Sequence, residues 1–297
     1  MRPSTQYLLL TACLISTMGC ASGLGSWSGL GKSPSAEVCV RPQIERGQPR
    51  PLVDGIGWVF GIPSKIILWD TRVDNHSISD DTEQAIAQYV NDQELSHTKV
   101  RINQYAPLDE WKRLTANHSV GWGWRYSLGT LTWLEETILP GRLFGTDHYN
   151  PYTDTISIYS DAPAIAIKEG SRARDVNSRQ YPGTYMAVNS LPLISMWHDT
   201  VATQYALEYL RDEHDEYVEE GYQLLYPAYG AHLGGDLVSF TTVPTTLGAA
   251  VGSIPGHILG RREAQRHHPK ETARAQSTVL DAHPMASDDT DESISQP

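Results

Sequence analysis

Apolar and polar side chains alternate most regularly in two short stretches of the chain. Residues 99–105 read KVRINQY and residues 155–159 read TISIY, so valine or isoleucine alternates with other residues in each. A period of two is typical of a β-strand that buries one face. We therefore expect a strand in both stretches. The second stretch leads through Asp161 to Pro163, which is a favourable start for a helix.

Four stretches have the periodicity or the boundary signals of helices: residues 80–93, 108–116, 164–175 and 191–210. Asp80 and Glu83 are expected to form a capping pair at the start of the helix predicted over residues 80–93. The glycines and aromatic residues of GWGWRY, residues 121–126, predict a turn between extended segments. The order of these elements predicts a single α+β domain with a mixed sheet and two successive helices packed near it.

The sequence Lys168-Glu169-Gly-Ser-Arg172 follows the apolar first turn of the third predicted helix. Lys168 and Arg172 are four residues apart, so they project from one side of the helix, where two cations repel. If that side lies in a cleft, each cation needs an acidic partner, because an unpaired buried charge is costly. Glu169, Asp199 and Glu208 are the candidates. The other interpretation is a solvated helix face.

The second strand, this helix and a later acidic residue together resemble the active-site region of HExxH zinc metallopeptidases of the gluzincin kind. The likeness is to compact versions found in bacterial lipoproteins and membrane proteins, and it covers about residues 80–260. It implies that Lys168 and Arg172 stand where the family has zinc-binding histidines. Glu169 then stands at the general-base position and Asp199 at that of the third ligand.

A protonated lysine and an arginine offer a metal no lone pair and repel a dication, so two of the three ligands are lost. We therefore predict a degenerate, non-catalytic domain without a cofactor, in which Lys168 and Arg172 replace the charge of zinc in a network of ion pairs. The alternative is an active metallopeptidase with unorthodox zinc ligands that keeps Glu169 as its base. Those ligands would come from the last predicted helix: His198, Asp199 and Glu208.

The amino terminus predicts the compartment. Residues 1–19 combine a basic start with an apolar stretch over residues 7–17 and small residues before Cys20. This resembles a bacterial lipoprotein signal peptide and implies lipidation of Cys20, with Cys13 as the second choice and an ordinary signal peptide or short anchor as the other interpretation. The protein is then a lipid-anchored component of the bacterial cell envelope, facing the periplasm or the surface. Residues 20–50, rich in Gly, Ser and Pro, predict a flexible tether.

Residues 237–260 contain no Asp, Glu, Lys or Arg. Glycine recurs there at every fourth position: Gly248, Gly252, Gly256 and Gly260. On a helix these glycines form a flat stripe that allows close packing. One interpretation is packing against the domain or a second copy, as in a self-associating structural protein. The other is a hairpin with the segment around Tyr229 that touches the membrane, although the prolines and threonines make a poor membrane span.

The folded domain is expected over residues 51–262, including the glycine-rich segment 230–260, and a disordered polar tail over residues 263–297. The formal net charge of −12 and the lack of a basic cluster argue against binding to nucleic acid. The expected partners are the membrane, through the lipid anchor, a second copy of the chain, and an envelope protein or peptide. Such a peptide would pair with residues 155–159 as an edge strand.

Overall fold

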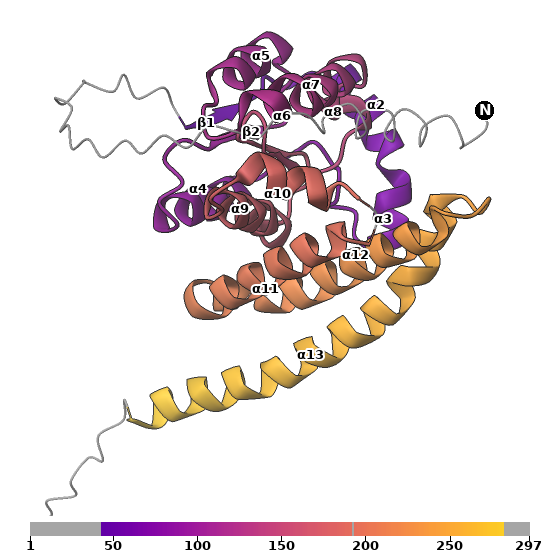
Figure 1. Cartoon of the computed structure of the whole chain (residues 1–297). Coiled ribbons are helices and arrows are strands. Elements are labelled where there is room, and N and C mark those ends of the chain that lie inside the picture. Colours follow the sequence, from indigo (N-terminus) through magenta and orange to yellow (C-terminus); the bar gives the residue numbers. More distant parts are fainter. Residues whose placement is uncertain (1–42, 192, 282–297) are drawn as a thin grey trace, which may run out of the picture. The chain divides into compact units, whose positions relative to one another are not determined.

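The computed structural model describes residues 43–191 and 193–281, all within the unit Arg41–Pro297 (Figure 1). The predicted signal peptide, Cys20 and most of the predicted tether lie outside the described residues, as does the end of the predicted tail. Nothing in the structure therefore bears on the signal peptide or on lipidation of Cys20, whereas the described parts of the tether and of the tail can be compared with their predictions.

The described fold is α+β, as the sequence predicted, and contains a mixed four-stranded sheet. Its strands are β1 (Ile44–Arg46), β2 (Lys99–Ile102), β3 (His148–Asn150) and β4 (Thr155–Ile158). The helices before β3 are α2 (Pro51–Phe60), α3 (Ile62–Leu68), α4 (Asp80–Asp92), α5 (Pro107–Ala116), α6 (Trp122–Tyr126), α7 (Leu128–Ile138) and α8 (Gly141–Phe144). Those after β4 are α9 (Pro163–Asn177), α10 (Pro182–Asn189), α11 (Ser195–Glu213), α12 (Val218–Val238) and α13 (Thr245–Asp281), with the 3-10 turn Asp215–Tyr217 before α12.

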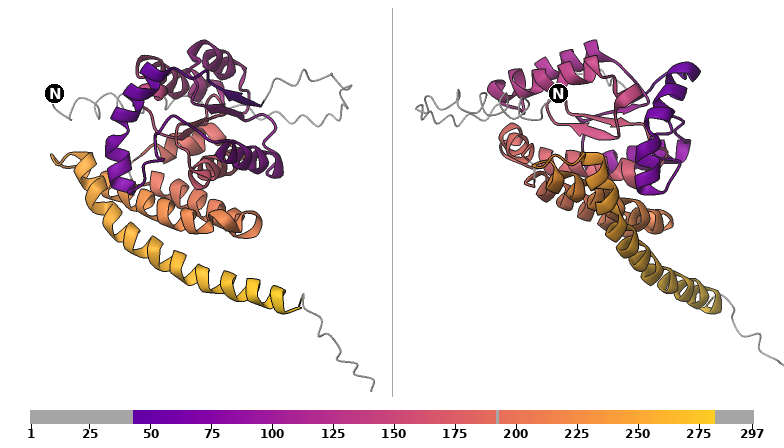
Figure 2. Two further views of the ribbon diagram at one scale, coloured as in Figure 1. Left: turned by 180° about the vertical axis from the view of Figure 1, so that it is seen from behind. Right: turned by 90° about the vertical axis from the view of Figure 1, so that its right-hand side faces the viewer.

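The sheet has the order β1-β2-β4-β3, with the first three strands parallel and β3 antiparallel to β4. Helices lie on both sides of it (Figure 2). The aliphatic side chains of β2 and β4 join α4, α9 and α11 in the main hydrophobic core. The intervening polar side chains contribute to a pocket shared with α5 and α7. The alternation seen in the sequence thus separates an apolar face from a polar face, and both are buried.

The prediction that residues 155–159 form an edge strand is wrong, because β4 lies between β2 and β3. The strand that covers its outer side is β3, whose three residues are too few to give a recognisable alternation. A peptide partner therefore cannot pair with β4 in this fold. The strands at the edges of the sheet are β1 and β3.

Three smaller predictions also need correction. The sequence predicts a tether up to residue 50, but β1 pairs with β2 because Ile44 and its neighbours find a parallel partner far along the chain. GWGWRY forms helix α6 and not a turn, since it packs against α7 and α10. Helix α4 is capped by Ser79, whose hydroxyl accepts the Thr82 N–H, while Glu83 is paired with Arg46.

Helices α12 and α13 form an antiparallel hairpin (Figure 1). The glycine stripe of α13 faces α12, and a Cβ added to any of its four glycines would lie less than 3.0 Å from an α12 backbone atom. The α12 carbonyl oxygens that approach them also recur at every fourth residue: Tyr222, Tyr226, Gly230 and Gly234. The stripe is therefore used within the chain, for contact between two helix backbones.

Helix α13 continues to Asp281, so the prediction that the chain becomes disordered at residue 263 is wrong for residues 263–281. A helix already anchored by packing extends without a new nucleation step, and this segment is rich in Ala, Arg, Glu and Gln, which favour helices. Among the described residues, no single helix is long and apolar enough to span a membrane. The pair α2–α3, bent by 49°, meets the length and composition requirements only when the two are taken together.

Candidate functional site

Helices α9 and α11 pack against each other and bring the predicted site residues together. The Lys168 Nζ lies 2.8 Å from Oδ1 of Asp199, and the Arg172 guanidinium pairs with the same oxygen. Two side chains one helical turn apart on α9 thus converge on one carboxylate of α11. Ion pairs predicted from the cation spacing are present, with Asp199 as their common partner.

Glu169 is engaged within the same cluster. Arg172 donates to both carboxylate oxygens at 3.0 Å, and Glu169 is only 3% exposed. Burial raises the pKa of Glu169, while Arg172 and Lys168 oppose that shift. A general base must be free to accept a proton from a reacting water. In this arrangement Glu169 is held by a guanidinium instead.

Asp199 is the centre of the cluster and is 1% exposed. Burial disfavours its charged form, but Lys168 and Arg172 outweigh burial and hold the pKa of Asp199 well below its usual range. Its other oxygen, Oδ2, faces Nδ1 of His232 on α12 at 3.5 Å. Asp236 lies 3.7 Å from the second ring nitrogen of His232, so this histidine stands between two acidic side chains.

No pattern in the sequence places His232 in this site. It lies on α12, and only the packing of α12 against α11 brings it to Asp199. A histidine four residues before an acid, such as Asp236, is too common a helical pattern to single out a site. Tertiary packing was the missing information.

The two remaining candidates lie elsewhere. The Nδ1 of His198 is 2.8 Å from Oδ2 of Asp175, which also accepts a 2.6 Å hydrogen bond from the Tyr185 hydroxyl. His198 is therefore oriented by a second polar cluster on α9 and α10. Glu208 lies on a different part of α11, where it is exposed and lines a surface hollow with Arg174 of α9. It takes no part in the ion pairs around Asp199. The prediction that Glu208 could pair with Lys168 or Arg172 is wrong, because its position on α11 is too far from both.

The residues at the predicted ligand positions do not fit a zinc ion. Lys168 and Arg172 contribute two positive charges, and Glu169 with Asp199 contributes two negative charges, so the four sum to zero without a metal. In the part of the chain that the structure describes, no group of three or more His, Cys, Asp or Glu side chains is arranged to hold a metal ion. The cluster joins α9 to α11 through ion pairs.

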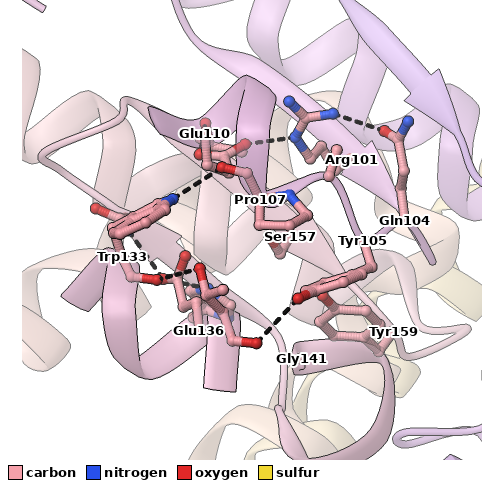
Figure 3. Close-up of a pocket in the computed structure, with 15 residues that line it drawn as sticks. Arg101, Gln104, Tyr105, Pro107, Glu110, Trp133, Glu136, Gly141, Ser157 and Tyr159 are labelled. Atoms are coloured by element: carbon pink, nitrogen blue, oxygen red, sulfur yellow. Dashed lines mark hydrogen bonds and ion pairs between the residues drawn. The ribbon is translucent and has the colours of Figure 1, made fainter. Parts of the chain in front are cut away.

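A separate pocket lies between the polar face of the sheet and helices α5 and α7 (Figure 3). Arg101 is paired with Glu110, which also accepts a 3.0 Å hydrogen bond from Thr155. Trp133 on α7 donates its indole N–H to the Pro107 carbonyl at 2.8 Å. These polar groups bind one another, so the pocket is held together by internal bonds.

The same pocket contains a titratable pair that predicts a pH effect. Burial opposes the charged form of His148, but its bond to Glu136 at 3.2 Å prevails and raises the pKa of His148 to about 9. Because the pKa is raised, the stability from this pair is fully present below about 6.5 and is lost as pH rises through about 9. We expect Glu136→Gln to reduce that loss and return the His148 pKa towards 6.5, as measured by NMR titration. An unchanged pKa in the variant would contradict the pairing.

Comparison of the chain with protein-family models, with curated proteins and with solved structures finds no match. The function therefore has to be argued from the residues of this chain.

Proposed function

We propose that this protein is a lipid-anchored component of the bacterial cell envelope with a degenerate, metallopeptidase-like core. The core is non-catalytic and serves as a structural and binding module. The observation that carries the proposal is the convergence of Lys168 and Arg172 on the buried carboxylate of Asp199. These three residues stand at the positions that the HExxH resemblance assigns to metal ligands.

One further feature supports the non-catalytic role, and another supports the lipid anchor. Glu169, at the general-base position, is bonded through both oxygens to Arg172. An arginine does not lose its proton in proteins, so this cation stays in place across the physiological pH range. The anchor is supported by the lipoprotein-like sequence before Cys20.

Restoring two histidines tests the relation to zinc peptidases. We expect Lys168→His combined with Arg172→His to bind about one zinc per chain, because two imidazoles four residues apart and one carboxylate supply three ligands. The wild-type protein, produced in the same zinc-supplemented medium, is expected to contain no stoichiometric zinc. Elemental mass spectrometry of the purified proteins measures both.

A triple variant that adds Asp199→Ala to the two histidines is the matched control and should lose the zinc. A double-histidine protein that folds but takes up no zinc would contradict the proposed geometry. Stoichiometric zinc in the wild type, lost on His198→Ala or Asp199→Ala, would favour the alternative of an active metallopeptidase with unorthodox ligands. Peptidase activity that chelators abolish would then decide for that alternative.

A further inference from the structure

Helices α2 and α3 expose an unusual number of large apolar side chains. Both are short and apolar, and most of their hydrophobic residues point away from the domain core: Leu52, Ile56, Trp58, Val59, Phe60, Ile62 and Ile66. The pair has the length and composition of a membrane segment but is bent. A core helix with such a composition would be buried, whereas these helices are not.

The end of the α12–α13 hairpin shows the same property. The stripe of glycines turns inward, and the larger side chains of the uncharged segment turn outward: Leu237, Phe240, Val243, Leu247, Val251, Ile254 and Ile258. Residues 237–260 lack any Asp, Glu, Lys or Arg that could keep this surface in contact with water. The hairpin therefore presents a second apolar surface to its surroundings.

The two surfaces are adjacent. The His257 ring on α13 stacks on Trp69, just after α3, with ring centroids 4.0 Å apart. Its Nε2 also lies 2.8 Å from the Ile67 carbonyl oxygen. Figure 2 shows α2 and α3 beside the end of the hairpin in its right-hand view. We define the apolar face as the exposed apolar side chains of α2, α3 and residues 237–259.

The ionic groups of α2 and α3 are turned inward and paired. Asp54 is bonded to Arg142 at 2.7 Å, and Lys65 is buried with its Nζ 3.0 Å from the Asp74 carbonyl oxygen. At the margin of the apolar face, the Arg261 guanidinium lies 5.0 Å from the Trp69 ring centroid. An apolar centre with tryptophan and arginine at its margin is typical of the interface between membrane and water.

We propose that the apolar face inserts into the interfacial region of a lipid bilayer, as a contact made by the folded domain itself. A monomeric soluble protein rarely exposes an apolar area of this kind. A charge-guided protein partner is disfavoured because the face offers no charged side chain for it to recognise. The α2 helix also begins only 31 residues after Cys20, since 51 minus 20 is 31, so an anchored chain would hold this face near the membrane.

Vesicle flotation tests the proposal on the chain from residue 20 with Cys20→Ser, which cannot be acylated and keeps the whole described unit. Vesicles of phosphatidylethanolamine and phosphatidylglycerol are the probe. We expect binding that persists when salt is raised from about 0.1 M to about 0.5 M, because apolar insertion is not screened. Ile66→Glu with Val251→Glu should weaken binding at least about tenfold.

The matched control is Leu108→Glu with Trp122→Glu, which places two charges at positions that are 76% exposed on α5 and α6. This control should bind as the wild type does. Hydrogen exchange on the wild type provides a measurement that needs no variant, and vesicles should protect the amides of α2, α3 and residues 245–259. Absence of flotation, or protection in none of these segments, would overturn the proposal. A stable dimer that covers the apolar face and does not bind vesicles would also overturn it.

The proposed membrane contact rests on the proposed function only for the presence of a membrane. Experiments can contradict the membrane contact and the lipid anchor independently of each other. Acylation of Cys20 is read from the mass of the wild-type chain isolated from bacterial membranes. An unmodified Cys20 with intact vesicle binding would remove the anchor and keep the apolar face as the membrane contact.

Discussion

Replacing Asp199 with alanine is expected to lower the free energy of unfolding by about 3–5 kcal/mol. The substitution removes the carboxylate that both Lys168 and Arg172 contact, and leaves the buried Lys168 without its acidic partner. Glu169 still pairs with Arg172, so the destabilisation comes mainly from the unpaired charge of Lys168. Urea unfolding at pH 7, followed by circular dichroism, measures the change.

Glu208→Ala on the same helix is the control, and as a change at an exposed position it should stay within about 0.5 kcal/mol of the wild type. The difference between wild type and Asp199→Ala should also depend on pH. Because the pKa of Asp199 is lowered in the folded state, its contribution is present above 3.8 and is lost as pH falls through the lower, folded value. Equal stability of the wild type and Asp199→Ala at pH 7 would show that the network is not stabilising.

Gly252→Ala is expected to destabilise the α12–α13 hairpin by about 1–3 kcal/mol, although alanine favours helices. Its new Cβ would lie less than 3.0 Å from the Gly230 carbonyl oxygen, so the two backbones must separate. Hydrogen exchange of α12 and α13 and urea unfolding together measure the effect.

Gly235→Ala is the matched control for the hairpin. It introduces the same methyl group on α12, where the nearest atom would be 3.7 Å away, so the helix should gain about 0.5–1 kcal/mol. A destabilising Gly235→Ala, or a neutral Gly252→Ala, would contradict the close contact of the two helix backbones.

The regular parts of this fold were predictable because their signals are local. Strands β2 and β4 have alternating side chains, and α5 and α9 have proline at their starts, so their sequences indicate both type and position. Strands β1 and β3 have three residues each and exist only because a neighbour offers hydrogen bonds. The order of strands, and with it the interior position of β4, depends on those two strands.

The site was predictable to a similar degree. The spacing of Lys168 and Arg172 on one helix indicated that both needed an acid, and Asp199 was among the candidates because it follows on the next long helix. The roles of His232 and Asp175 depend on contacts across helices, which no periodicity encodes. His198, a candidate ligand only for the alternative of an active metallopeptidase, is held by Asp175.

The charge balance at Asp199 has a consequence for how the domain becomes stable after synthesis. A metal-dependent domain becomes stable only when its ion is delivered, so its abundance follows metal availability. Here the chain brings its own counter-charges in Lys168 and Arg172, and they are present as soon as the chain is synthesised. The ion pairs that join α9 to α11 thus balance the charge of Asp199 with side chains of the same chain.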